Sequence, residues 1–306
     1  MAIFKAPYPP IECPAIPRLA VVVNKSKIPR NLQGRKPMEV QAHIRVFQPC
    51  SALQNFVRSY TVASITGSQT WVRTQPAHPQ QYLVFYPYDP QSHSIDGNSF
   101  QRLSKELVIG PHTKPVYLLC SPLQLMILVS LLPGALHRLT RLPLQEILNQ
   151  PLDGVNGFGS EMRSVNERLS DMKTTEQMIQ VVEAFLLRKV QHVKEPLPID
   201  QTFHLLLAAP NQYSIAQLAN LSCVSLRQFE RQFLERIGTS PTTFIRQARF
   251  SNALRLKRTH PELNWTVVAN KCGYFDQMHL IRDFKQFTSA TPTSFKNFVA
   301  APPLLN

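Results

Sequence analysis

The sequence from position 273 to 285 is Gly273-Tyr274-Phe275-Asp276-Gln277-Met278-His279-Leu280-Ile281-Arg282-Asp283-Phe284-Lys285, a short turn that leads directly into a helical pattern. Gly273 can adopt a positive φ, and Asp276 is a good N-cap for the helix that follows. Leu280, Phe284 and Phe287 recur at spacings of four and three residues, which predicts one buried stripe. The opposite face offers amide, imidazole, thioether and guanidinium groups, a mixture suited to base edges in a DNA major groove: Gln277, Met278, His279 and Arg282.

Taken alone, this stretch is more typical of an ordinary amphipathic helix with a solvated polar face. The same pattern, however, occurs a second time earlier in the chain, and that repetition reverses the interpretation. Phe229, Arg231, Phe233, Pro241 and Phe244 are matched at a constant offset by Leu280, Arg282, Phe284, Pro292 and Phe295. The offset is one residue shorter at Ala219 and Ala269, so the second turn contains one inserted residue.

Each repeat is a short helix, a tight turn and a longer helix, which predicts two helix-turn-helix units joined by a long helix. A rigid linking helix can hold two exposed helices one DNA turn apart, about 34 Å, so that a monomer enters two successive major grooves. We expect seven helices after the Pro-containing linker around 194–198, at 199–208, 214–220, 226–237, 241–257, 266–271, 277–287 and 293–298.

With these residues in view, the region 199–299 resembles the DNA-binding domain of the AraC family of bacterial transcription regulators. The motifs that carry the resemblance are Ile215-Ala216-Gln217-Leu218-Ala219, the stretch from Ser225 to Phe233, Gly238-Thr239-Ser240-Pro241, Arg249 with Ala253 and Leu254, and the whole of 273–292. Two helix-turn-helix units at the right spacing make the match specific.

The resemblance implies two sets of DNA-contacting residues. The base-reading set is Arg227, Gln228, Glu230 and Arg231 on the first recognition helix and Gln277, Met278, His279 and Arg282 on the second. The expected phosphate contacts are Arg246, Arg249, Arg255, Lys257, Lys271, Lys285 and Lys296. For each of these the alternative is a solvated surface charge, and for Arg249 it is a position near the core.

The second unit departs from the family pattern. Met278 replaces a small polar residue, Leu280 replaces an aromatic, and Ser289 stands where Gly238 supplies a glycine in the first unit. If Ser289 has a positive φ, it costs about 1 kcal/mol of strain. We therefore expect the second unit to be the less regular reader of bases.

The remaining composition agrees with a polyanion as partner. The chain has 306 residues, 43% of them apolar, a net charge of +14 and a pI of about 9.8. Its five scattered cysteines lack C-x-x-C spacing, which indicates reduced thiols and a cytoplasmic protein. No signal peptide or membrane-spanning run is evident, since the most apolar stretch, 116–132, reads as two buried strands joined at Ser121-Pro122.

Residues 1–40 are rich in proline, lysine and arginine, which predicts a disordered basic tail with a short strand at 19–23; translation from Met38 is an equal alternative. The region that follows predicts a small β-barrel or sandwich, with strands at 82–86, 106–109, 116–120 and 125–131 and a hairpin turn at 96–98. Accessory helices are expected at 53–60, 144–148, 161–170 and 175–190. The whole chain is therefore expected to have an α+β fold. We place the domains at 41–193 for the N-terminal sensor, 194–300 for the AraC-type domain and 301–306 for a disordered end.

Around Pro133-Gly134 and 142–147 the chain resembles the end of a poorly characterised domain often attached to AraC-type regulators, and no ligand is implied by it. The histidines there lack metal-ligand spacing, and no nucleophile elbow, phosphate loop or paired carboxylates appear, so neither a metal, a cofactor nor an enzyme is expected. This domain then senses a small effector or a partner, or it is inert and only positions the rest.

The favoured function is a sequence-specific transcription regulator whose partners are double-stranded DNA and RNA polymerase, with an unidentified small-molecule effector and no membrane. The oligomeric state stays open, a homodimer included. The alternatives are an architectural DNA binder and, at much lower weight, a DNA alkyl-repair protein, for which the Pro-Cys-His-Arg run is missing because Ser51 follows Cys50.

Overall fold

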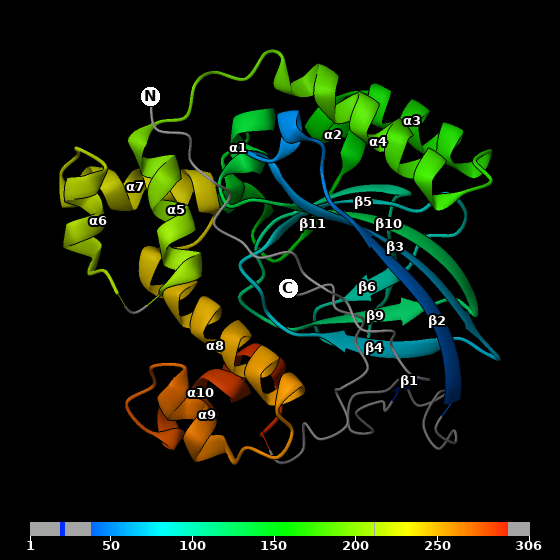
Figure 1. Cartoon of the computed structure of the whole chain (residues 1–306). Helices are drawn as coiled ribbons and strands as arrows, with labels where there is room; N and C mark the ends of the chain where they lie inside the picture. The colour runs from blue at the N-terminus through cyan, green and yellow to red at the C-terminus, as the bar shows by residue number, and fades with distance from the viewer. Residues whose placement is uncertain (1–18, 22–37, 211, 293–306) are drawn as a thin grey trace.

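The computed structural model describes residues 19–21, 38–210 and 212–292. All of its described strands lie at or before residue 153, with a few short helices among them, and the described elements after that residue are helices (Figure 1). The chain is therefore α+β, as the sequence predicts.

The N-terminal strands form two sheets, and all the strand pairs in them are antiparallel. The larger sheet runs in the order β1 (Leu19–Val21), β2 (Met38–Phe47), β3 (Val57–Gly67), β10 (Leu123–Leu131), β5 (Gln81–Phe85), β8 (Glu106–Ile109) and β11 (Pro151–Asp153). The smaller runs β4 (Trp71–Gln75), β9 (Val116–Cys120), β6 (Ser92–Ser94) and β7 (Gln101–Arg102). Neither sheet closes on itself, so of the two predicted alternatives the barrel is wrong.

Short helices cover one face of the larger sheet. They are α1 (Ala135–Thr140), α2 (Gly154–Phe158), α3 (Glu161–Ser170) and α4 (Thr175–Val190), together with the 3-10 turns η3 (Ser51–Leu53) and η4 (Leu144–Ile147). Figure 1 shows α3 and α4 lying across this face. Phe85, Ile127 and Val129 from the strands share one buried core with Val182 and Phe185 of α4.

The sequence predicts several of these elements, errs at one and leaves others unpredicted, among them β2, β4 and α2. Strands 106–109 and 116–120, helices 161–170 and 175–190, and the turn at 96–98 between the paired strands β6 and β7 are confirmed. The expected helix at 53–60 is wrong, because β3 begins at Val57 and pairs with β10. Long-range pairing of the buried Val57, Tyr60 and Val62 overrides a local pattern that fits a helix.

The C-terminal half consists of α5 (Pro198–Ala208), α6 (Ile215–Leu221), α7 (Leu226–Ile237), α8 (Pro241–Thr259), α9 (Trp265–Lys271) and α10 (Gln277–Thr288). These six helices match the first six predicted ones, with ends that move by two residues at most. In Figure 1, α8 runs between the group α5 to α7 and the pair α9 and α10.

Some expectations fall on parts of the chain that are not described. The helix predicted at 293–298, Lys296 and the end at 301–306 lie outside the described residues. Within the predicted tail 1–40, only 19–21 and 38–40 are described, and these form the paired strands β1 and β2. None of the described helices is both long and apolar enough to cross a membrane.

Candidate nucleic-acid interface

The long helix α8 contributes aromatic side chains to the cores of both helix-turn-helix units. Near its start, Phe244 packs edge-to-face against Phe233 of α7, with ring centroids 5.6 Å apart. At its midpoint, Phe250 packs in the same way against Phe284 of α10 at 5.2 Å. All four rings are fully buried, so one rigid helix joins the two cores.

Each recognition helix begins at a side-chain cap. Ser225 and Gln228 form a reciprocal capping box at the start of α7, in which the Gln228 amide donates to Ser225 Oγ at 3.3 Å and the Ser225 amide donates to Gln228 Oε1 at 3.2 Å. At the start of α10, the amide of His279 donates to Asp276 Oδ1 at 2.7 Å. This bond is the main reason why the pKa of the Asp276 carboxyl lies below its usual value.

The predicted base-reading residues of the first unit share one exposed surface of α7. Arg227, Gln228, Glu230 and Arg231 are all exposed, whereas Phe229 and Phe233 on the other side are buried. Gln228 is occupied by the capping box. Among the described residues, neither Arg227 nor Arg231 has an ion-pair partner, so both guanidinium groups are available to a ligand.

The second unit presents a different surface. Met278, His279 and Arg282 are exposed, but Gln277 is half-buried and its Oε1 accepts a hydrogen bond from Thr266 Oγ1 at 2.8 Å. His279 Nδ1 lies 3.0 Å from Asp276 Oδ1. Arg282 forms no ion pair within the described chain, which leaves it as the free cation of the predicted base-reading set on α10.

The predicted phosphate contacts divide into two groups. Lys271, Lys285 and Arg255 are exposed at the surface of the second unit or of α8. Arg246 and Lys257 are engaged inside the domain instead: Arg246 Nη2 bonds Asp283 Oδ1 at 2.6 Å, and Lys257 Nζ donates to the carbonyl of Pro261 at 2.6 Å.

Arg249 also faces the protein. It lies over the ring of Tyr274, with 5.8 Å from its guanidinium carbon to the ring centroid, and donates to the carbonyl of Gly273 at 3.4 Å. This agrees with the alternative that the sequence leaves open for Arg249, a position near the core.

Contacts between the two halves of the chain are the feature that sequence reasoning misses. The amide of Ala77 donates to the carbonyl of Phe287 on α10 at 2.8 Å, and Ala77 is part of the second unit's core. Gln247, fully buried on α8, donates to the carbonyl of His112 at 2.5 Å. The sequence offered one indication of this contact, which is that the polar residue Gln247 lies on the apolar side of a predicted helix.

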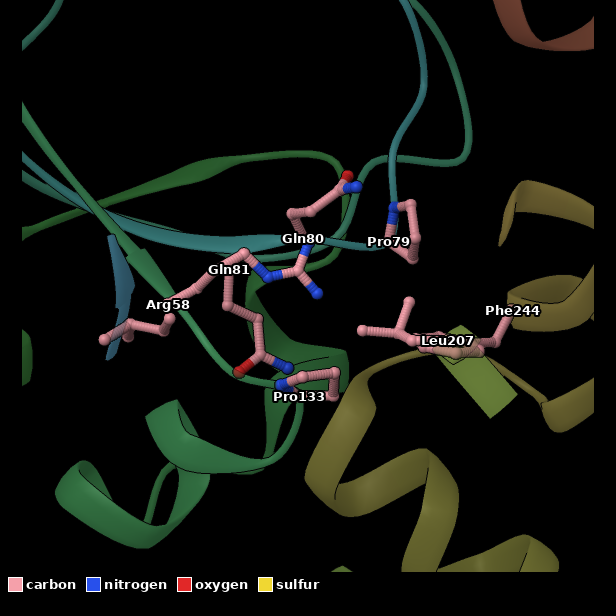
Figure 2. Close-up of a pocket in the computed structure, with 8 residues that line it drawn as sticks. Arg58, Pro79, Gln80, Gln81, Pro133, Leu207 and Phe244 are labelled. Atoms are coloured by element: carbon pink, nitrogen blue, oxygen red, sulfur yellow. The ribbon is translucent and has the colours of Figure 1, made fainter. Parts of the chain in front are cut away.

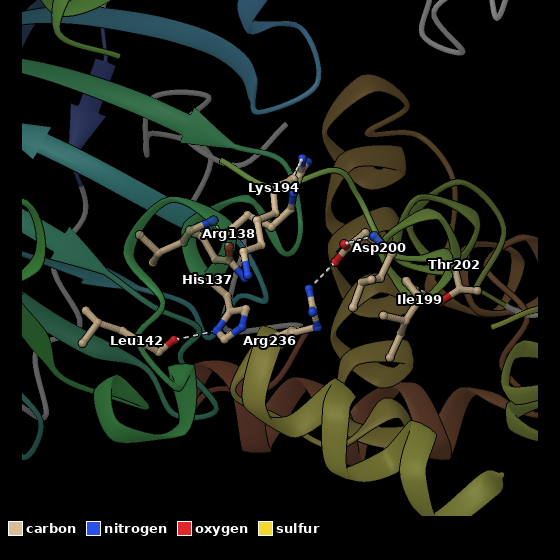
Figure 3. A network of polar contacts seen from close by, with 11 residues as sticks. His137, Arg138, Leu142, Lys194, Ile199, Asp200, Thr202 and Arg236 are labelled. Carbon is tan, nitrogen blue, oxygen red and sulfur yellow. Dashed lines mark hydrogen bonds and ion pairs between the residues drawn. The ribbon is translucent and has the colours of Figure 1, made fainter. Parts of the chain in front are cut away.

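Polar contacts lie on both sides of the same boundary near the first unit (Figure 3). Arg236 on α7 forms an ion pair with the buried Asp200 of α5 at 2.7 Å. His137 Nδ1 lies 2.9 Å from the carbonyl of Leu142, and burial lowers the pKa of this imidazole. Arg138 donates to the carbonyl of Lys194 at 3.2 Å, which ties α1 to the segment before α5.

A small pocket opens beside this boundary (Figure 2). The N-terminal half supplies Arg58, Gln80 and Gln81, and the helical half supplies Leu207 and Phe244; Pro79, Leu131 and Pro133 complete the lining. No group of three or more potential metal-ligating side chains occurs in the described part of the chain.

Comparison with known proteins adds two family matches. Residues 218–297 match a helix-turn-helix domain, and residues 45–153 match a domain of unknown function (DUF6597).

The arabinose operon regulatory protein of Escherichia coli (strain K12) is 28% identical over 129 residues, 39% of this chain and 43% of that protein. An uncharacterized HTH-type transcriptional regulator of Haemophilus influenzae is 31% identical over 91 residues, 29% of this chain and 30% of that protein. The match thus spans less than half the length of these curated relatives.

Among solved structures, ToxT from Vibrio cholerae O395 is 10% identical, covering 86% of this chain and 98% of that one with a TM-score of 0.44. The DNA-binding domain of AdpA, solved in complex with a target DNA, is 24% identical, covering 33% of this chain and 90% of that one with a TM-score of 0.31.

Proposed function

We propose that this chain, which belongs to the AraC family by its double helix-turn-helix domain, is a sequence-specific transcription regulator that binds duplex DNA. The recognition helices α7 and α10 enter two successive major grooves, held apart by α8. The proposal places the DNA-binding domain at 194–300 and a regulatory domain at 41–193.

One observation carries this proposal most strongly. Two capped helices, each with a buried aromatic core on one side, expose polar and cationic side chains on the other. Arg227, Arg231 and Arg282 have no ion-pair partner among the described residues, which suits groups that form bidentate hydrogen bonds to guanine. The net charge of +14 supports a polyanionic partner.

The N-terminal domain is the proposed regulatory part. It contacts α8 and α10 through His112 and Ala77, so a change at these loops reaches the second unit directly. A small-molecule effector and RNA polymerase are the partners that the family resemblance implies, and the proposal assigns no catalytic step. The proposal covers both a monomer and a homodimer, which a direct measurement of molecular mass in solution distinguishes.

The proposal is tested by selecting duplexes from a random pool with the full chain and then measuring the affinity of variants for the selected duplex. Arg231→Ala and Gln277→Ala should each weaken binding by about 1–3 kcal/mol at fixed salt without lowering the melting temperature. Arg168→Ala and Gln180→Ala, at exposed positions on α3 and α4, are the matched controls and should bind as the native chain does.

Equal binding by all four variants would contradict the assignment of α7 and α10. Binding and transcription that respond to no metabolite, together with an unchanged melting temperature across a metabolite panel, would favour an architectural DNA binder with an inert N-terminal domain.

A further inference from the structure

Phe275 has no counterpart in the first helix-turn-helix unit. The turns of the two units share their anchors: the amide of Val224 donates to the carbonyl of Ala219 at 3.2 Å, and the amide of Tyr274 donates to the carbonyl of Ala269 at 3.0 Å. In the first unit the N-cap Ser225 follows Val224 directly. In the second unit, Phe275 stands between Tyr274 and the N-cap Asp276.

Because the residues on both sides are fixed, the inserted residue is pushed outward. Tyr274 is buried on one side, and Asp276 is held by the amide of His279 on the other. Phe275 is 90% exposed, the largest exposed fraction among the large hydrophobic side chains of the described chain. The backbone of the turn therefore presents the whole ring of Phe275 to solvent, where a partner can bury its apolar surface.

The ring of Phe275 is oriented by its neighbours. It meets the imidazole of His279 edge-to-face, with centroids 6.0 Å apart and planes at 90°. His279 is itself held by Asp276, whose Oδ1 lies 3.0 Å from Nδ1. Met278 is 57% exposed on the same end of α10. Phe275 and Met278 thus form an apolar tip at the beginning of the second recognition helix.

The charges of this unit favour DNA as the occupant over an apolar protein surface. Arg282 lies one helical turn after Met278, and Lys271 and Lys285 are also exposed. Of the nearby carboxylates, Asp283 is neutralised by its ion pair with Arg246, and Asp276 accepts the hydrogen bond that caps the helix from the amide of His279. A unit that exposes an apolar tip together with the cations Lys271, Arg282 and Lys285 is complementary to a groove lined by phosphates.

The location of the tip also defines the contact. The N-terminal residues of a recognition helix approach base edges in the major groove, and the apolar group presented there is the 5-methyl group of thymine. We propose that Phe275, together with Met278, reads thymine methyl groups in the half-site bound by the second unit, an inference that rests on the proposed function. The second unit then reads thymine-containing steps for which the first unit has no equivalent residue.

The test uses the full chain and the duplex that it selects from a random pool. Each thymine of the selected duplex is replaced in turn by deoxyuridine, which keeps the base-pairing edge and O4 and lacks only the methyl group. The native chain should bind about fourfold more weakly for each contacted methyl that is removed. Phe275→Ala should lose this sensitivity, while thymines facing α7 provide an internal control.

Three outcomes would overturn the inference. In the first, the native chain is insensitive to deoxyuridine at every position, and in the second, Phe275→Ala is as sensitive as the native chain. In the third, Phe275→Ala binds the duplex with native affinity but supports less transcription by RNA polymerase, which would assign Phe275 to a protein contact. If the native chain selects no duplex, the proposed function fails as well, so the two failures are distinguishable. Leu123→Ala, at a site 68% exposed on β10, controls for loss of an exposed apolar side chain.

Discussion

The side-chain amide of Gln247 on α8 donates a hydrogen bond to the backbone carbonyl of His112 at 2.5 Å. His112 in turn pairs with His78 through two backbone hydrogen bonds of 2.9 Å, and the neighbouring Ala77 amide bonds Phe287 of α10. The N-terminal domain is therefore hydrogen-bonded to the linking helix α8 and to the second recognition helix α10 at neighbouring positions, residues 77 and 112. Under the proposed function, this contact connects the N-terminal domain directly to the helices whose orientation would determine DNA binding.

Loss of the Gln247 bond should destabilise the chain. In Gln247→Ala, the buried His112 carbonyl keeps only the bond from the His78 amide, and loss of the second hydrogen bond costs about 0.5–1.5 kcal/mol of unfolding free energy. Urea unfolding of the full chain measures the effect. Thr242→Ala, on the exposed side of the same helix, should lie within about 0.5 kcal/mol of the native chain. Equal midpoints and slopes for Gln247→Ala and the native chain would show that the two halves do not depend on this bond.

Ser289 holds a left-handed backbone at the end of α10. Its φ is 56°, the same region as Gly238 (φ 86°) at the end of α7. Ser289→Gly should relieve the strain and raise the unfolding free energy by about 0.5–1 kcal/mol. The measurement is thermal or urea unfolding at neutral pH.

The reciprocal change provides the control for this prediction. In Gly238→Ser the new Cβ would lie 2.8 Å from the carbonyl oxygen of Leu144, so steric overlap adds to the strain. This variant should lose more stability than Ser289→Gly gains. A Ser289→Gly variant that is less stable than the native chain would indicate that the serine makes a contribution that outweighs its backbone strain.

The sequence predicts the helical half well because its information is local and repeated. The spacing of Phe229 and Phe233, the cap at Ser225 and the glycine at Gly238 define α7, and their echo defines α10. The repeat also locates the insertion in the second turn, although only the structure shows that Phe275 is the residue pushed into solvent.

Structural features that depend on contacts between residues far apart in the sequence cannot be predicted from such local patterns. Residues 57–60 join a sheet because β10 lies beside them, and no local pattern near Gln247 identifies His112 as its partner. The same limitation applies to the ion pair of Arg246 with Asp283, 2.6 Å away, which the charge of Arg246 alone does not identify.

The buried histidine pair should make stability depend on pH. Burial is the main cause that lowers the pKa of His112 to about 4 and that of His78 well below 6.5, and each ring lies near another imidazole, with 5.2 Å between their centroids. The groups facing them are the Tyr82 ring, His93 and the backbone of Gln80. Both imidazoles are therefore neutral in the folded chain at neutral pH.

The sign follows from proton binding. Above about pH 6.5 neither the folded nor the unfolded state protonates these rings, so they contribute no pH dependence. Between about 6.5 and 4 the unfolded state binds more protons, and the unfolding free energy should fall as pH falls, by up to about 1.4 kcal/mol per pH unit for each histidine. His112→Phe should flatten the dependence, whereas His192→Phe, at an exposed position, should not. An unchanged slope in His112→Phe would contradict a buried neutral imidazole.

Lys271 and Lys257 should respond differently to substitution, although the sequence assigns both to phosphate contacts. Lys271 is exposed at the end of α9, so Lys271→Ala should weaken binding to specific and random duplexes alike and reduce the slope of log affinity against log salt by about 1. Lys257 Nζ instead bonds the carbonyls of Pro261 and Leu263, and its charge lies 5.6 Å from the Trp265 ring centroid. Lys257→Ala should therefore lower the melting temperature and leave the salt slope nearly unchanged.

Duplex titrations at several salt concentrations, combined with thermal unfolding, distinguish the effect on DNA binding from the effect on stability. If both variants reduce the salt slope equally, Lys257 leaves its internal bonds when DNA binds, and its role is electrostatic rather than structural.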